Sequence, residues 1–389
     1  MDFQNNSSFF DEYKKKELSK SPFIKIKPSF SLKSVPKVIG EGSYGCVHKP
    51  SLKCAKKKNI YTKKISKLME EKDAKREMKE YNIIKKFDKT KKYHLGVPTK
   101  CKFKKSLKNL KAMDECTERR FFSSNIDNLH LLIMSDGGIN LDDYSSIIEK
   151  RDPTKENIKK NFLFWKEVSR LLEGLLKLKK SKIIHHDLKP QNIVYDESKN
   201  RLNFIDFGLM TNSKDIIKSS LKSTNKHSAL HWSYPFELFF YNKTNFYFSS
   251  RQKNEMYESV YFKEKLKTFL FYTKKETSNK IIDEFAESYR KHIFPKLKKI
   301  KYDKFIKKTI FTIDTYGMGI ALIYVFMGAQ HLFGEDDSIK NIKHELYELF
   351  SNMVSPDFTI RYTIEEIIEK YEIIILKWEN MRLNTTTAK

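Results

Sequence analysis

The stretch IIHHDLKPQNIVYD, residues 183–196, decides the fold, and LNFIDFGLM, residues 202–210, follows it closely. In the first stretch Asp187, Lys189 and Asn192 stand in an otherwise apolar frame, and the second stretch places another carboxylate among apolar neighbours. The spacing of these polar groups requires an explanation in terms of function, and the flanking sequence supplies it.

Upstream, KVIGEGSYGCVHKP, residues 37–50, predicts a strand, a tight glycine turn and a second strand. Glycines at this spacing let backbone amides approach phosphate oxygens where a Cβ atom would collide. Dinucleotide sites share the spacing but need a helix directly after it, and the proline that closes this stretch comes too soon for one. Ordinary hairpins use the same glycines, so this turn either only connects the two strands or covers a nucleotide, which would then lie against Gly40, Glu41, Gly42, Ser43, Tyr44, Gly45 and Val47.

Together these segments resemble the catalytic core of eukaryotic-type protein kinases. HHDLKPQN, residues 185–192, is similar to the family's H-R-D-L-K-P-x-N, and its D-F-G motif is present from Asp206. By that resemblance, Asp187 accepts or orients the proton of the substrate hydroxyl and Lys189 steadies the γ-phosphate of ATP. Asn192 and Asp206 hold Mg²⁺, with Mn²⁺ as an alternative metal. Phosphoryl transfer depends mainly on positioning and charge neutralisation, which these residue types supply.

The resemblance extends from about Lys37 to Glu379. HWSYPFE ends in a variant of the family's A-P-E motif, and the resemblance implies an ion pair between its Glu237 and Arg361. It also implies that Asp314, in a buried central helix, accepts hydrogen bonds from the catalytic-loop backbone.

The implied fold is α+β and two-lobed: an N-lobe with an antiparallel sheet and one main helix, and a larger, mainly helical C-lobe. The expected boundaries are a polar N-terminal extension at 1–35, a kinase domain at 36–380, an N-lobe at about 36–134, a hinge at 133–138, a C-lobe at about 139–380 with an insertion at about 240–310, and a C-terminal tail at 381–389.

Two residues of the nucleotide site are predicted from their order in the chain. Lys67, in the strand-like ISKLM, is the preferred phosphate-binding lysine, and Lys63 and Lys64 are alternatives. On the following helix Glu80 is preferred over Glu77 as the partner of the lysine, because apolar residues follow Glu80 at helical spacing.

Two departures from the family pattern predict functional differences. His186 stands where the family has arginine, so we expect activity without phosphorylation of the activation segment; the alternative is that His186 only packs. Glu237 and Asp314 are 77 positions apart, and this distance predicts an ordered insertion, which either docks a substrate or regulator or covers apolar surface.

The composition restricts partners and location. The formal net charge of +27 favours nucleic acid or another anionic surface, although lysines spread along the chain indicate composition bias equally well. The most apolar window, residues 316–329, is shorter than a bilayer span, so we expect a buried helix and no transmembrane segment. The four cysteines form no CxxC pair and predict reduced thiols in a cytosol-like compartment.

The most specific hypothesis is an ATP- and Mg²⁺-dependent serine/threonine protein kinase. Its sequence resembles kinases of giant or other large cytoplasmic DNA viruses, which implies a location in host cytoplasm or virion; a lysine-rich protist kinase would look similar. The alternatives are a pseudokinase scaffold, a small-molecule kinase of related fold, and a basic nucleic-acid-binding protein.

Overall fold

The computed structural model describes residues 35–42, 45–56, 61–117, 125–222, 231–334 and 336–387. Residues 36–389 form one compact unit. The predicted N-terminal extension lies outside the described residues except for Val35, and so do Ser43 and Tyr44 of the glycine turn.

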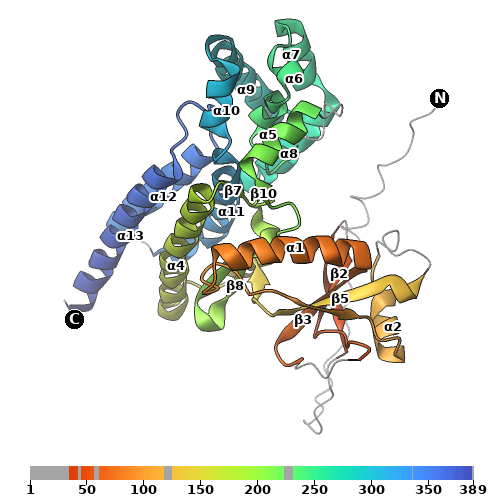
Figure 1. The fold of residues 1–389 in the computed structure, drawn as a ribbon. Coiled ribbons are helices and arrows are strands. Elements are labelled where there is room, and N and C mark those ends of the chain that lie inside the picture. Colours follow the sequence, from red (N-terminus) through yellow and green to blue (C-terminus); the bar gives the residue numbers. More distant parts are fainter. Residues whose placement is uncertain are drawn as a thin grey trace. The chain divides into compact units, whose positions relative to one another are not determined.

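The N-terminal part is a five-stranded antiparallel sheet with the strand order β1-β2-β3-β5-β4. Helix α1 lies across this sheet (Figure 1) and buries the face that carries Ala74, Glu77, Tyr81 and Ile84, at the three- and four-residue spacing of an amphipathic helix. The elements are β1 Lys37–Gly42, β2 Gly45–Lys49, β3 Lys64–Glu70, α1 Glu71–Phe87, β4 Thr99–Lys102, α2 Leu107–Asp114, η2 Ile126–Asn128 and β5 Leu129–Ser135.

Two small sheets connect this part to the helices, with strand orders β6-β8-β9 and β10-β7. They carry the segment that contains Asp187, since β7, η3 and β8 fall within residues 183–196. The elements are β6 Ile139–Asn140, α3 Leu141–Ile148, α4 Lys155–Lys180, β7 Ile183–Ile184, η3 Pro190–Asn192, β8 Ile193–Asp196, η4 Glu197–Lys199, β9 Arg201–Phe204, β10 Thr211–Asn212 and α5 Ser213–Lys222.

Helix α11 is the centre of the helical part, where it contacts α3, α8 and α12. The segment Thr312–Leu332 is long and apolar enough to cross a membrane, but 89% of its apolar window is buried in the fold. It is therefore the buried helix that the sequence predicted. The elements of this region are η5 Phe236–Tyr241, α11 Thr312–Ala329, η6 Gln330–Leu332, α12 Asp337–Met353 and α13 Ile364–Thr387.

The predicted insertion is helical. Its helices α8 and α9 bury aromatic side chains, among them Phe262, Phe269 and Tyr289, against the segment that carries Glu237. The insertion therefore covers apolar surface. Its elements are α6 Lys243–Phe246, α7 Ser250–Glu258, α8 Val260–Lys274, α9 Asn279–Lys299 and α10 Tyr302–Thr309.

Two expectations are wrong. The C-terminal tail does not begin at residue 381, because α13 continues to Thr387. The cysteines are not reduced thiols, because disulfides join Cys46 to Cys116 and Cys54 to Cys101. Their long sequence separations, 70 and 47 residues, hid these pairs from a search for local cysteine motifs.

Candidate active site

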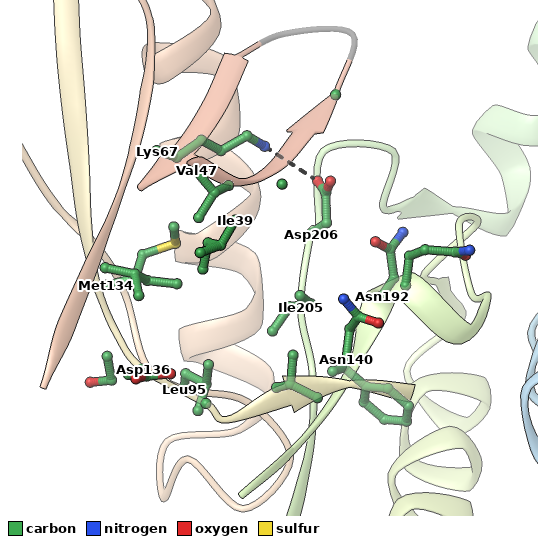
Figure 2. Close-up of a pocket in the computed structure, with 18 of the residues that line it drawn as sticks. Ile39, Val47, Lys67, Leu95, Met134, Asp136, Asn140, Asn192, Ile205 and Asp206 are labelled. Atoms are coloured by element: carbon green, nitrogen blue, oxygen red, sulfur yellow. Dashed lines mark ion pairs between the residues drawn. The ribbon is translucent and has the colours of Figure 1, made fainter. Parts of the chain in front are cut away.

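A cavity of about 300 Å³ lies between the five-stranded sheet and the helical part. Figure 2 shows apolar side chains, including Ile39 and Val47, along its sheet side. Lys67 and Asp206 face each other at one end, and Asp136 lies at the other. The cavity thus has a charged end and an apolar middle, the combination that suits a phosphorylated ligand with a flat ring system.

Lys67 is the lysine that the cavity uses. Its Nζ lies 2.8 Å from Oε2 of Glu77 and 3.7 Å from Oδ1 of Asp206. Burial disfavours the ammonium, but the two carboxylates outweigh it and raise the pKa of Lys67 above its usual value. The same lysine charge holds the pKa of Asp206 below its usual value. Both groups are therefore ionised at neutral pH.

The two alternative lysines are engaged elsewhere. The Nζ of Lys64 donates to Oγ of Ser135 at 2.9 Å. Lys63 precedes β3 in a turn with a left-handed φ of 53°. Strand register explains the choice, since Lys67 pairs with Val47 and Leu132 in the centre of the sheet.

The prediction that Glu80 faces this lysine is wrong, because Glu77 occupies that place. Glu77 lies on the buried face of α1, four residues before Tyr81, and is 5% exposed. Glu80 was preferred because apolar residues follow it, but the first of them, Ile83, is 40% exposed. The buried face of α1 is therefore rotated away from Glu80.

The catalytic-loop residues predicted from the sequence lie together. Nζ of Lys189 is 2.9 Å from Oδ1 of Asp187, and Nδ2 of Asn192 donates to Oδ2 of Asp187 at 2.8 Å. Burial raises the pKa of Asp187, although Lys189 and Asn192 act in the opposite direction. A carboxylate with a raised pKa is a stronger proton acceptor, as general-base catalysis requires.

This loop rests directly on α11. The Asp314 carboxylate accepts backbone N–H groups from His185 at 2.7 Å and His186 at 2.9 Å. One turn on, a Cβ atom at Gly317 would lie 2.2 Å from the carbonyl oxygen of Leu188. The predicted role of Asp314 is confirmed, and Gly317 permits a contact that no other residue type allows.

The glycines of the turn have different structural roles. A Cβ atom at Gly40 or Gly42 would meet no described protein atom within 4 Å, so packing among these residues does not require glycine there. At Gly45 it would lie 2.2 Å from the carbonyl oxygen of Leu68, so this position must be glycine for the sheet to form. All three line the cavity with Glu41, whose carboxylate accepts the backbone N–H of Thr117 at 2.9 Å.

The predicted hinge, residues 133–138, supplies Met134 and the following residues to the cavity wall. Leu95 also lines this end (Figure 2), from the segment between α1 and β4. Leu95 was not predicted, because a single leucine in KKYHLGVPTK, residues 91–100, belongs to no pattern that would identify it.

A family model of the protein kinase domain matches residues 34–372, a range that includes every site residue described above. The chain is a protein kinase. No curated protein matches it. Membership of the family implies that this kinase uses ATP and a divalent metal ion to phosphorylate a protein substrate.

The donor groups of this kinase fit a divalent cation. Asp206 and Asn192 both line the cavity, and carboxylate and amide oxygens are the ligands that hard cations prefer. The hydrogen bonds described for the Asn192 side chain use its NH₂ group, which leaves the amide oxygen available as a ligand. When bound, a divalent cation neutralises the phosphate charge that develops during transfer.

A neutral side chain, His186, precedes the predicted catalytic Asp187 in this kinase. The His186 ring stacks on Tyr234, with centroids 4.9 Å apart and planes 4° apart. Burial, together with the neighbouring His185, lowers the pKa of His186 to about 4. His186 is therefore uncharged at neutral pH.

The predicted ion pair between Glu237 and Arg361 is confirmed. Both side chains are buried, the guanidinium Nη1 bonds Oε1, and Nη2 lies 2.9 Å from Oε2. The bidentate geometry fixes the end of the activation segment on the kinase core.

Proposed function

We propose that this kinase transfers the γ-phosphoryl group of ATP to serine or threonine hydroxyls of proteins, with Mg²⁺ as the metal. Lys189 carries the proposal: it lies two residues after Asp187 and its Nζ is 2.9 Å from the Asp187 carboxylate. This position resembles the serine/threonine branch of the family. The cation beside Asp187 supports the transferred phosphoryl group while Asp187 acts on the hydroxyl.

Each residue of the site has its own role in the proposed reaction. Asp187 orients the hydroxyl and accepts its proton, helped by a pKa that burial raises. Lys67, held by Glu77, binds phosphate oxygens of the nucleotide, and Asp206 and Asn192 hold the metal ion. Asp314 keeps the backbone next to Asp187 in place.

We also propose that the kinase is active without phosphorylation of its activation segment. A fixed cation before the catalytic Asp needs a phosphate to offset it, and the stacked, neutral His186 creates no such need. Phosphatase-treated kinase should retain most of its turnover, and loss of nearly all turnover would contradict the proposal.

The test of the function is transfer of labelled phosphate from ATP and Mg²⁺ to casein and myelin basic protein, followed by phosphoamino-acid analysis. Wild type should yield phosphoserine or phosphothreonine, and Asp187→Asn should yield neither. Tight ATP binding without transfer above the level of Asp187→Asn would support a pseudokinase scaffold. Labelled phosphotyrosine would leave the kinase assignment intact but exclude the serine/threonine branch.

From the sequence resemblance we further propose an origin in a large cytoplasmic DNA virus and a location in the virion or host cytoplasm. The two disulfides favour the virion, because disulfides seldom persist in a reducing cytosol. Detection of the kinase in purified particles, with its cysteines resistant to alkylation before reduction, is the expected result.

A further inference from the structure

A second cavity, of about 550 Å³, lies within the insertion and away from the catalytic residues. It is formed by α6, α7, the end of α9 and the start of α10, all labelled in Figure 1. Four lysines line it, Lys243, Lys253, Lys298 and Lys301, against a single acidic residue, Asp303. The cavity therefore has a strong excess of positive charge.

Two other lysines of the insertion have carboxylate partners. Lys263 of α8 pairs with Asp283, and Lys296 of α9 pairs with Asp357. No ion pair with a carboxylate is found for any of the four cavity lysines among the described residues. Lys298 lies in the last turn of α9, where the helix dipole also favours a cation. The position of Lys298 alone is therefore weaker evidence for a bound anion.

Lys253 is the strongest evidence that the cavity binds an anion. Its side chain is 5% exposed, and its described side-chain contact is a cation–π contact with Phe240, 5.9 Å from the ring centroid. Buried lysines are normally paired, because burying an ammonium without a counter-charge is costly. Burial and the nearby charge of Lys298 lower the pKa of Lys253, as expected for a cation that lacks a partner. An anion in the cavity would supply that partner.

Helix α10 begins at the same cavity. Its N-cap residue is Lys301, whose side chain forms no capping hydrogen bond. A lysine at the positive end of a helix is electrostatically unfavourable, and Asp303 in the first turn offsets it in part. The N-terminus of a helix is a common binding site for phosphate.

We propose that this cavity binds a ligand that carries several clustered phosphate groups, either a free polyphosphorylated small molecule or the headgroup of a polyphosphorylated lipid. Four lysines and one aspartate match an anion with several charges better than one phosphomonoester. A cavity whose key cation is buried also fits a compact ligand better than a nucleic acid, which binds along an extended exposed strip.

The test is isothermal titration of the full chain with inositol hexakisphosphate and, separately, with inorganic tripolyphosphate. Lys253→Met retains the apolar stem but removes the charge, and affinity should fall about tenfold or more. The double variant Lys298→Gln/Lys301→Gln, at two exposed positions, should weaken binding comparably. It replaces Lys253→Met in the test if that variant does not fold. Lys307→Gln, on the outside of α10, is the matched control for charge, and Lys67→Met is the control for binding in the nucleotide pocket. Both controls should bind as wild type does.

Flotation with vesicles that contain phosphatidylinositol bisphosphate distinguishes the two sources. Vesicle binding that depends on Lys253, with weak binding of both free probes, assigns the lipid headgroup; tight binding of a free probe assigns the small molecule. The proposal is overturned if neither probe nor vesicle binds, or if Lys307→Gln or Lys67→Met weakens binding as much as Lys253→Met. Tighter binding of single-stranded RNA than of either probe, lost in Lys253→Met, would overturn it in favour of nucleic acid.

Discussion

The phenol ring of Tyr272 stacks on the indole ring of Trp232, with centroids 4.4 Å apart and planes 10° apart. Tyr272 belongs to insertion helix α8, and Trp232 precedes Glu237 in the activation segment. The Tyr272 hydroxyl also accepts a hydrogen bond from Nε2 of Gln191 at 2.7 Å, within the catalytic loop. One side chain of the insertion thus holds two segments that surround the reacting groups.

Replacing Tyr272 should therefore impair the proposed activity. Tyr272→Ala removes a ring stack and a hydrogen bond, each worth about 1 kcal/mol, so kcat/KM for the protein substrate should fall by up to about thirtyfold. Tyr272→Phe keeps the stack and should lose less. Tyr261→Ala, on the exposed side of α8, is the control. An unchanged kcat/KM in Tyr272→Ala would show that Tyr272 only packs against Trp232 and does not support the reaction.

The ion pair of Lys67 gives a prediction with a matched control. Lys67→Met should lower turnover by about a hundredfold or more, because a cation that stabilises the phosphoryl transition state is lost. Glu77→Gln should lower it about tenfold, since the lysine loses the carboxylate that positions it. Glu80→Gln should stay close to wild type. Steady-state kinetics with ATP measure the turnover of these variants. Equal losses of turnover in Glu77→Gln and Glu80→Gln would contradict the structure.

Breaking the buried pair between Glu237 and Arg361 should destabilise the fold. Glu237→Gln leaves the guanidinium buried without its counter-charge, which typically costs about 3–5 kcal/mol. Lys377→Gln breaks a surface pair with Glu345 and should change stability by about 0.5 kcal/mol or less. Urea unfolding of wild type, Glu237→Gln and Lys377→Gln measures both changes in stability. Similar midpoints for wild type and Glu237→Gln would show that the buried pair contributes little.

His186 predicts how stability depends on pH. Its pKa is about 4 in the folded chain and about 6.5 when unfolded, so the unfolded state binds more protons between these values. The contribution of His186 is therefore fully present above about pH 6.5 and is lost as the pH falls towards 4. His186→Phe keeps a ring on Tyr234 but cannot titrate. Melting temperatures across this window should fall less steeply in the variant, and parallel curves would contradict the assignment.

Some of the site could be read from the sequence because its geometry is local. Asp187, Lys189 and Asn192 lie within six positions, so the backbone of one short loop brings them together. Glu77 was missed because the choice between Glu77 and Glu80 depends on how α1 rotates over the sheet. That rotation follows from packing, and the apolar pattern of the helix was compatible with either glutamate facing the sheet.

The remaining errors concern contacts between distant segments. Trp232 and Tyr272 are 40 positions apart and Cys46 and Cys116 are 70 apart, and neither pair has a local motif. Ordered matches to family motifs predicted Asp314 and the pair between Glu237 and Arg361, which are also far apart. The insertion has no such counterpart, so its contacts with the catalytic loop could not be foreseen.

The contact of Gly317 with the carbonyl of Leu188 has a consequence for how such a chain diverges. Any side chain at 317 must push the catalytic loop away from the core helix, while the rest of the helical part keeps its packing. A lineage that substitutes this position would lose turnover before it loses the fold. An inherited change of one residue could thus convert a working kinase into a folded nucleotide-binding scaffold, with every catalytic side chain still present.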